Sequence, residues 1–298
     1  MRPVKKTQFF FDTYHKSILV VSRIKMAETI NSTLLRSDPS DWKSINLRLR
    51  DSISRFVPCT FPNRMLFLTH PKNGTMLTRN MILHFAGIEQ THVPLLMDVP
   101  AAMTAFANAD RQFYYGHVPA VPEWADMLAG YRKVLQIRNP VDTIVALARA
   151  SLDPRSERAD HVYFRESGAT VEDLVPLIVD GYDMCGIQMS PFNRSFQHFV
   201  LDWVGQADEI IQFEQVLSDV SALMAGCGSE TGWGLVRQLG LPACEDWRER
   251  LVAGACETNS TTYLPPFADD RRASALRLAA SLLDPAIKAS AASLGYSL

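Results

Sequence analysis

The sequence predicts an α/β protein, because two short apolar strands each continue through a turn into a helix with apolar residues on one side. The first unit has a β-prone run at 65–69 and a helical pattern at 75–85. The second unit has a strand pattern at 133–137 and a helical pattern at 140–151. At 298 residues the chain can hold one large α/β domain or two small ones.

The composition is that of a globular protein without a strong charge bias. Hydrophobic residues make up 47% of the chain and charged residues 21%, with a formal net charge of −2. Without an excess of positive charge we expect no nucleic-acid partner, and an acidic ligand would need a local basic pocket. No apolar run approaches the roughly 20 residues of a membrane span, and Asp12 interrupts the apolar run at 9–11. We therefore expect a cytoplasmic protein with no membrane partner.

The cysteines suggest neither a disulfide framework nor a metal site. The five are scattered and form no Cys-x-x-Cys pair: Cys59, Cys185, Cys227, Cys244 and Cys256. This pattern is typical of reduced thiols in a cytoplasmic protein, and we expect no metal.

The turn at 70–74 has the features of a phosphate-binding loop. It follows a strand and precedes a helix, so unpaired N–H groups of the first helical turn point at any anion bound there. Lys72 adds a mobile positive charge beside Gly74. The pattern differs from the Walker P-loop, which requires Gly-x-x-x-x-Gly-Lys-Ser/Thr. The structural alternative is a turn of the same kind that binds nothing.

The run Pro-Lys-Asn-Gly-Thr at 71–75 resembles the 5′-phosphosulfate loop of sulfotransferases that use 3′-phosphoadenosine 5′-phosphosulfate (PAPS), which usually reads Pro-Lys-Ser-Gly-Thr. The resemblance implies that Lys72 stabilises charge on the leaving phosphate. It also implies that backbone N–H groups and the Thr75 hydroxyl hold the 5′-phosphate. Leu77 departs from the family, which often has a Trp there near the adenine. The cofactor-binding residues expected in this loop are Lys72, Asn73, Gly74, Thr75, Met76 and Leu77.

A histidine follows the next strand pattern, at 113–116. Because the carboxyl ends of strands in open α/β sheets carry the chemistry, His117 is a candidate site residue. A structural histidine that caps a loop is the alternative. The run Gly-His-Val-Pro at 116–119 resembles the Thr-His-Leu-Pro of the sulfotransferases, and this resemblance implies that His117 is the catalytic base. The Lys that is common two positions earlier in the family is Tyr115 here.

The strand at 133–137 ends in Arg-Asn-Pro-Val-Asp, with Pro140 in the first helical turn, where its missing N–H costs nothing. A surface arginine at a strand–helix junction is the structural alternative. The run resembles the family's 3′-phosphate motif, which implies that Arg138 binds the 3′-phosphate of PAPS. A guanidinium suits a phosphate dianion. The family usually has a Ser eight residues later, but this chain has Ala146, so Arg149 or a loop elsewhere would have to compensate.

A short strand pattern at 210–213 provides the last similar segment. Trp203 and the Phe-Glu-Gln-Val run at 213–216 resemble the family's Trp…Tyr-Glu-Asp-Leu segment. The resemblance implies that the Phe213 ring packs in the cofactor site without the hydroxyl of the usual Tyr. We expect Glu214 to be structural. The Gly-rich basic loop that closes many members is not found, and its nearest candidates are Arg271 and Arg272.

The resemblance spans roughly residues 63–241 through four segments in the family's order. It implies a three-layer, P-loop-like α/β fold with a central parallel sheet of about five strands, helices on both faces and right-handed crossovers. We expect residues 61–298 to form a single domain, with residues 1–60 as an N-terminal extension packed on the core.

The second half of the chain is predicted to be mostly helical. Helical patterns favour helices at 171–189, 194–204, 218–242 and 269–283, with a loop at 162–168 over the site. Four acidic residues flank the loops expected around the acceptor: Asp153, Asp160, Glu166 and Asp173. If some of them line the pocket, a cationic acceptor would suit; solvated loop charges are the alternative.

The implied reaction transfers a sulfuryl group from PAPS to a hydroxyl or amine of a small-molecule acceptor and leaves 3′-phosphoadenosine 5′-phosphate (PAP). One alternative is a nucleotide-dependent, kinase-like transferase on a related fold, which would require a Gly-Lys-Ser/Thr run and a magnesium carboxylate. Another is a non-catalytic family member, for which Leu77, Ala146 and Phe213 would be signs of drift.

Overall fold

A computed structural model of the chain describes residues 47–90, 95–97, 99–108, 111–122, 124–256 and 269–298. Most of the expected N-terminal extension therefore lies outside the described residues. Its described part includes a helix at 47–53, whose Leu49 and Ile53 side chains are buried in the main core. These residues give the end of the extension a structural role against the domain.

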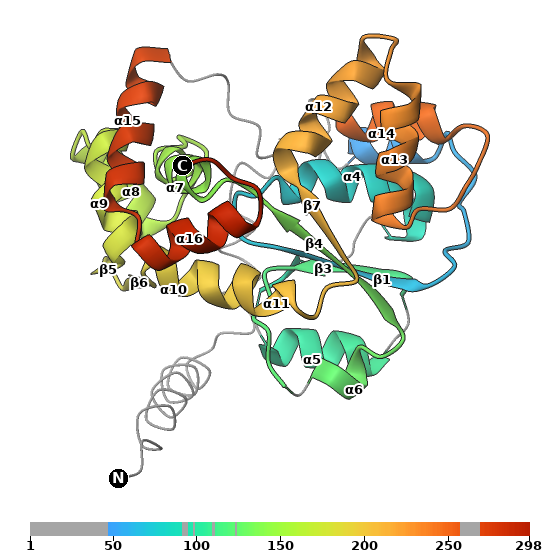
Figure 1. Ribbon diagram of the computed structural model, residues 1–298, viewed down its shortest axis with the longest axis horizontal. Helices are drawn as coiled ribbons and strands as arrows, with labels where there is room; N and C mark the ends of the chain where they lie inside the picture. Colours follow the sequence, from blue (N-terminus) through green and yellow to red (C-terminus); the bar gives the residue numbers. More distant parts are fainter. Residues whose placement is uncertain (1–46, 91–94, 98, 109–110, 123, 257–268) are drawn as a thin grey trace.

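The core is a five-stranded parallel sheet in the order β2-β3-β1-β4-β7 (Figure 1). The strands are β1 Arg64–Thr69, β2 Leu95–Leu96, β3 Phe113–Gly116, β4 Tyr131–Ile137 and β7 Glu209–Gln212. This arrangement confirms the predicted α/β fold with its central parallel sheet. β1 is the middle strand, and five of its six residues are buried, as expected for a parallel strand covered on both faces.

The register of the parallel strands brings their carboxyl ends to one edge. Leu68 of β1 pairs with Gly116, the last residue of β3, and Thr69 pairs with Gln136 of β4. Ile137, the last residue of β4, pairs with Gln212 of β7. The loops that follow β1, β3, β4 and β7 therefore begin side by side, which is where open α/β sheets bind ligands.

Helices cover both faces of the sheet, as predicted. Figure 1 shows α4, α12, α13 and α14 on one face and α5 and α6 on the other, while the remaining helices gather beyond one end of the strands. The first group is α4 Thr75–Ala86, α12 Phe213–Met224, α13 Ser229–Leu239 and α14 Trp247–Ala255; the second is α5 Val99–Asn108 and α6 Trp124–Met127; the third is α7 Pro140–Ser151, α8 Ala159–Glu166, α9 Val171–Asp180, α10 Phe192–Phe196, α11 Asp202–Val204, α15 Asp269–Leu282 and α16 Pro285–Ser293.

The helix at 171–189 was predicted too long. α9 ends at Asp180, and the chain then forms a hairpin of β5 (Tyr182–Met184) and β6 (Ile187–Met189). Gly181 has a φ of 76°, and a Cβ there would lie 2.6 Å from the Met189 carbonyl oxygen. A glycine in this conformation ends a helix, because side chains strongly disfavour it.

Other boundaries also differ from the prediction. The expected loop at 162–168 lies mostly in α8, and the expected helix at 218–242 is two helices. Gly226 and Gly228, with φ values of 82° and 75°, separate them. The helix expected at 194–204 forms as α10 and α11 joined by a π-helical segment at Gln197–Leu201.

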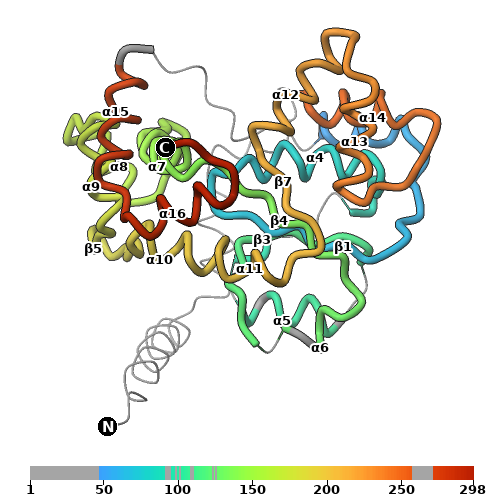
Figure 2. Tube along the Cα trace, in the orientation of Figure 1, coloured from blue at the N-terminus to red at the C-terminus, as the bar shows by residue number. Residues whose placement is uncertain are grey.

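The C-terminal segment, which carried no sequence motif, returns to the sheet. Figure 2 shows the chain after α16 lying beside α7. The Gln212 side chain donates to the Leu294 carbonyl oxygen at 2.8 Å, and the Tyr296 hydroxyl donates to Glu214 at 3.1 Å. The end of the chain therefore braces the β7–α12 junction.

No helix among the described residues is long and apolar enough to span a membrane.

Helix α14 approaches α4 closely, and α4 is the helix that follows the turn at 70–74. A Cβ on Gly254 would lie 2.5 Å from Met81 Cα and 2.9 Å from the Asn80 carbonyl oxygen. Arg250, one turn earlier, is buried and donates to the His84 carbonyl oxygen at 2.7 Å. The contact between the two helices therefore requires a glycine at position 254 and the buried guanidinium of Arg250.

We expect Gly254→Ala to lower the free energy of unfolding by about 1–3 kcal/mol, because the new methyl group meets backbone atoms that cannot yield. Gly234→Ala in α13 is the matched control, since nothing lies within 4 Å of a Cβ there. It should instead gain about 0.5–1 kcal/mol from helix propensity. Urea unfolding measures both, and equal effects of the two substitutions would contradict the close approach.

Candidate active site

Three sequence-predicted residues meet at the carboxyl edge of the sheet. Lys72, His117 and Arg138 follow β1, β3 and β4, respectively. Arg138 Nη1 donates to the Lys72 carbonyl oxygen at 2.8 Å. His117 Nδ1 lies 2.8 Å from the carbonyl oxygen of Thr69, three residues before Lys72. The topology thus joins residues that lie 21–66 positions apart in the chain into one site.

The backbone of β1 fixes the orientation of His117. A carbonyl oxygen only accepts, so the contact with Thr69 assigns the proton to Nδ1. The Thr69 hydroxyl lies 3.0 Å from the same nitrogen and 2.6 Å from the Thr75 hydroxyl. This tautomer leaves the Nε2 lone pair of His117 available to accept a proton.

Burial keeps His117 neutral. Desolvation lowers its pKa to about 4; the hydrogen bond to Thr69 opposes this shift, and the charge of Lys72 adds to it. The imidazole is therefore unprotonated at neutral pH, as a general base must be. An anion that neutralises Lys72 would remove one of the causes that weaken this base.

A second histidine, His70, is held at both ring nitrogens. Nδ1 lies 2.9 Å from the Pro71 carbonyl oxygen, and Nε2 lies 3.0 Å from the Ser195 hydroxyl. Its ring packs against Phe192. Desolvation lowers its pKa to about 3. Because neither nitrogen is available, His70 supports the loop, and His117 is the better candidate base of the two.

Lys72 adopts a backbone conformation that is rare for a residue with a side chain. Its φ of 67° lies in the left-handed region, which costs about 1–2 kcal/mol outside glycine. Burial is the largest cause that lowers the pKa of Lys72; Asp153 opposes the shift, while Arg155 and Arg158 add to it. Strained, desolvated residues of this kind cluster at ligand sites.

Fewer backbone N–H groups are available to an anion in the turn at 70–74 than the sequence predicts. The Asn73 N–H donates to the His70 carbonyl oxygen at 3.1 Å, and the Leu77 N–H donates to the Gly74 carbonyl oxygen at 3.1 Å. Gly74 is the N-cap of α4 with a φ of 83° and supplies no side-chain cap. The predicted set is therefore reduced to the N–H groups of Gly74, Thr75 and Met76, at the end of a helix where an anion is favoured.

Asn73 anchors the loop through its polar groups. Its Oδ1 accepts from the Thr143 hydroxyl at 2.9 Å, and its carbonyl oxygen accepts from Gln136 Nε2. Gln136 also accepts from the Thr78 hydroxyl at 2.6 Å. Gln136 and Thr143 were not among the residues predicted from the sequence. A glutamine inside an apolar strand was the available signal, since buried polar side chains are hydrogen-bonded.

Phe213 lies between the loop and Arg138. The Arg138 guanidinium carbon is 4.9 Å from the Phe213 ring centroid. A Cβ on Gly74 would lie 2.0 Å from the same ring, so only glycine allows this contact. Arg138 Nε is buried without a partner among the described residues. The site thus holds a desolvated cation with a donor to spare, an arrangement that fits an anionic ligand.

The far side of Arg138 carries two more arginines. Asp142, Ala146 and Arg149 are spaced by four and three residues, which places them on one side of α7. Arg272 of α15 pairs with Asp142 at 3.2 Å. Burial and then the charge of Arg272 lower the pKa of Arg149. Arg149 and the Arg272–Asp142 pair therefore lie on the side of α7 that carries Ala146.

Glu214 is structural, as predicted. Its carboxylate accepts from the Asn139 N–H at 3.0 Å and from the Tyr296 hydroxyl at 3.1 Å. Asn139 in turn caps α7 through its side chain. Glu214 therefore fixes Asn139, the residue next to Arg138.

The acidic residues expected near the acceptor are largely paired. Arg155 forms two hydrogen bonds with Asp153, at 2.9 and 2.7 Å. Arg158 forms a bidentate pair with Asp160, and Asp173 completes the predicted capping box of α9. Asp153 and Asp160 are therefore neutralised by arginines, and Asp173 has a structural role in the helix cap.

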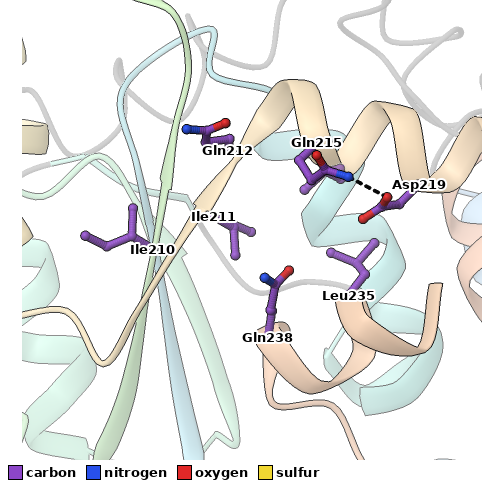
Figure 3. Close-up of a pocket in the computed structure, with 8 residues that line it drawn as sticks. Ile210, Ile211, Gln212, Gln215, Asp219, Leu235 and Gln238 are labelled. Atoms are coloured by element: carbon purple, nitrogen blue, oxygen red, sulfur yellow. Dashed lines mark hydrogen bonds between the residues drawn. The ribbon is translucent and has the colours of Figure 1, made fainter. Parts of the chain in front are cut away.

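A cavity of about 250 Å³ lies beside β7 at the edge of the sheet (Figure 3). Figure 3 shows Gln212 of β7, Gln215 and Asp219 of α12, and Gln238 of α13 around it. Its lining includes none of Lys72, His117 and Arg138.

The described residues contain no cluster of three metal-ligating side chains.

Comparison with known proteins assigns the chain to no family, so the function of the site is inferred from its geometry. No family model and no curated protein matches the chain. Among solved structures, it is similar to mouse sulfotransferase SULT7A1 complexed with PAP, with a TM-score of 0.41 and 14% identity. The similarity covers 70% of this chain and 68% of that chain.

The buried histidines should make stability depend on pH. Burial lowers the pKa of His70 to about 3 and that of His117 and His161 to about 4. Between pH 6.5 and 4 the unfolded chain binds more protons at these sites, so stability is lost as pH falls. Each histidine contributes up to about 1.4 kcal/mol per pH unit.

Urea unfolding between pH 7.5 and 5 measures this slope. His161→Gln should flatten it by roughly one histidine's share, because that side chain then has no proton to bind. A free energy of unfolding that stays constant over this range would contradict the burial of neutral imidazoles.

Proposed function

We propose that the protein is a sulfotransferase that moves a sulfuryl group from PAPS to a hydroxyl or amine of a small-molecule acceptor. The observation that carries the proposal is the convergence of Lys72, His117 and Arg138 at one sheet edge, with Arg138 donating to the backbone of Lys72. These groups combine two cationic anion-binding side chains with one neutral base.

The donor set fits a nucleotide with phosphates at both ends. One end is the helix terminus at 74–76 with Lys72, which suits the 5′-phosphosulfate. The other end is Arg138, whose Nε is buried without a partner among the described residues. We infer that Arg149 and Arg272 replace the missing serine contact at Ala146 through charge.

Within this proposal PAPS supplies the sulfuryl group, and the chain supplies position and charge. His117 takes the acceptor proton at Nε2, and its Nδ1–H, held by the Thr69 carbonyl oxygen, stabilises the imidazolium that forms. Lys72 and the N–H groups of Gly74, Thr75 and Met76 stabilise the charge that develops on the leaving phosphate. Phe213 gives the nucleotide an aromatic contact beside Arg138.

Two other functions remain as alternatives. A kinase-like transferase would need acidic ligands for magnesium. The carboxylates described beside Arg138 already have partners, since Asp142 pairs with Arg272. Glu214 accepts from the Asn139 N–H and the Tyr296 hydroxyl. A non-catalytic family member would need no free base, and the orientation of His117 argues against it. The acceptor is proposed to be a small molecule in the cytoplasm.

Ligand-induced stabilisation separates sulfotransferase from kinase-like binding. PAP should raise the melting temperature, because a ligand at 100 times its Kd stabilises the native state by about 2.7 kcal/mol. ATP with magnesium should give little shift at the same concentration. Lys72→Met should reduce the PAP shift. A larger shift with ATP and magnesium than with PAP would support the kinase-like alternative.

His117→Ala should lower kcat for sulfate transfer by at least about 10²-fold, because the acceptor proton loses its base. Its affinity for PAP should stay near that of the unsubstituted protein, since His117 holds no phosphate. Transfer from labelled PAPS to a panel of phenols, alcohols and amines measures the rate. His198→Ala is the control, as His198 is exposed and pairs with Asp202. Full activity in His117→Ala would remove His117 from the mechanism.

A further inference from the structure

Two thiols lie outside the proposed active site, where the segment before β1 is next to the connection between α13 and α14. Cys59 lies in the segment before β1, and its N–H donates to the Phe85 carbonyl oxygen at 2.8 Å. Cys244 lies in the connection between α13 and α14, and its carbonyl oxygen accepts from the Trp247 N–H at 3.3 Å. The structure places both thiols around the same guanidinium, that of Arg250, although 185 positions separate them in the chain.

Arg250 binds the chain on both sides of the two thiols. The Val57 carbonyl oxygen accepts from Arg250 Nη2 at 2.9 Å and lies 4.0 Å from Cys59 Sγ. The same guanidinium binds both carboxylate oxygens of Asp246, at 2.7 and 2.8 Å, two residues after Cys244. One buried side chain therefore fixes the backbone on both sides of the thiol pair.

The thiol pair is accessible from the surface. Cys59 and Cys244 are both half-buried and free. A surface hollow of about 400 Å³ is lined by Cys244 together with Trp233 and Trp247. A molecule as small as hydrogen peroxide can reach a thiol at such a place.

We propose that Cys59 and Cys244 form a peroxide-sensitive pair that closes a reversible disulfide. One hydrogen peroxide oxidises the Cys59 thiol to a sulfenic acid and releases one water. The Cys244 sulfur then attacks the sulfenic sulfur, the S–S bond forms, and a second water leaves with the Cys244 proton. Two thiols and one peroxide thus give one disulfide and two waters.

The surroundings of the two sulfurs set this order. Burial, Asp246 and the neighbouring Cys59 raise the pKa of Cys244 to about 12, while Arg250 opposes the shift. Cys244 is therefore protonated at neutral pH and is a poor first nucleophile toward peroxide. Cys59 Sγ lies 4.0 Å from the Val57 carbonyl oxygen, which also accepts from the Arg250 guanidinium, so a positive charge lies close to this sulfur.

The disulfide would act on the helix that begins at the phosphate-binding loop. It would tie the segment at 57–59 to the connection that leads into α14. α14 rests on α4 through Gly254 and Met81, and Arg250 donates to His84 at the end of α4. Oxidation should therefore stabilise the contact between α14 and α4, with a rise in melting temperature on the order of 5–10 °C.

The test treats the full chain with hydrogen peroxide, blocks the remaining thiols with N-ethylmaleimide and identifies cross-linked peptides by mass spectrometry. The expected product is an intramolecular Cys59–Cys244 disulfide that leaves three of the five thiols free. Its formation should speed up as pH rises from 7 to 9, because Cys244 attacks as the thiolate. Dithiothreitol should restore all five thiols and reverse the rise in melting temperature.

Matched variants make the outcome specific. Cys59→Ser and Cys244→Ser should each abolish both the disulfide and the thermal shift, whereas Cys185→Ser, at an exposed position, should change neither. The two serine variants should bind PAP like the unsubstituted protein under reducing conditions, so the result does not depend on the proposed activity. A main disulfide through Cys185 or Cys227, or oxidation of Cys59 that proceeds only to the sulfinic acid, overturns the proposal.

Discussion

The site depends on the backbone of one strand. β1 is the middle strand of the sheet, with β3 on one side and β4 on the other, so the residues that follow all three strands must meet. The Thr69 carbonyl oxygen then fixes the ring of His117, and the Lys72 carbonyl oxygen fixes Arg138. Main-chain acceptors cannot change rotamer, so the backbone holds the side chains of both His117 and Arg138 in place.

The second constraint is electrostatic. The carboxyl edge gathers Lys72 and Arg138 away from solvent, and burial lowers the pKa of both. The nearby carboxylates have other partners, since Arg155 binds Asp153 and a backbone N–H binds Glu214. Desolvated cations without matched carboxylates destabilise an empty protein and favour an anion strongly. The strained φ of Lys72 is consistent with the same compromise between folding and binding.

The features that are local in the chain could be predicted from the sequence. β4 and the helix that starts at Pro140 lie within one stretch, so their pattern could be read directly. The cap at Asn139 was not predicted. β2 has only two residues, and no periodicity can reveal a strand of that length. The bond from Gln136 to the Asn73 backbone joins positions 63 residues apart, and nothing local encodes such a pairing. The smaller set of available N–H groups in the turn at 70–74 was not predicted, because it depends on how the turn closes on itself.

The most direct test compares the affinities of PAP and adenosine 5′-phosphate by calorimetry, in the unsubstituted protein and in Arg138→Met. The account requires one nucleotide to lie between Lys72 and Arg138. The unsubstituted protein should therefore bind PAP at least about tenfold more tightly than adenosine 5′-phosphate, as expected for a charged hydrogen bond to the 3′-phosphate. Arg138→Met should lose most of that preference. Equal affinity for both nucleotides in the unsubstituted protein, or a full preference in Arg138→Met, would contradict the two-ended site.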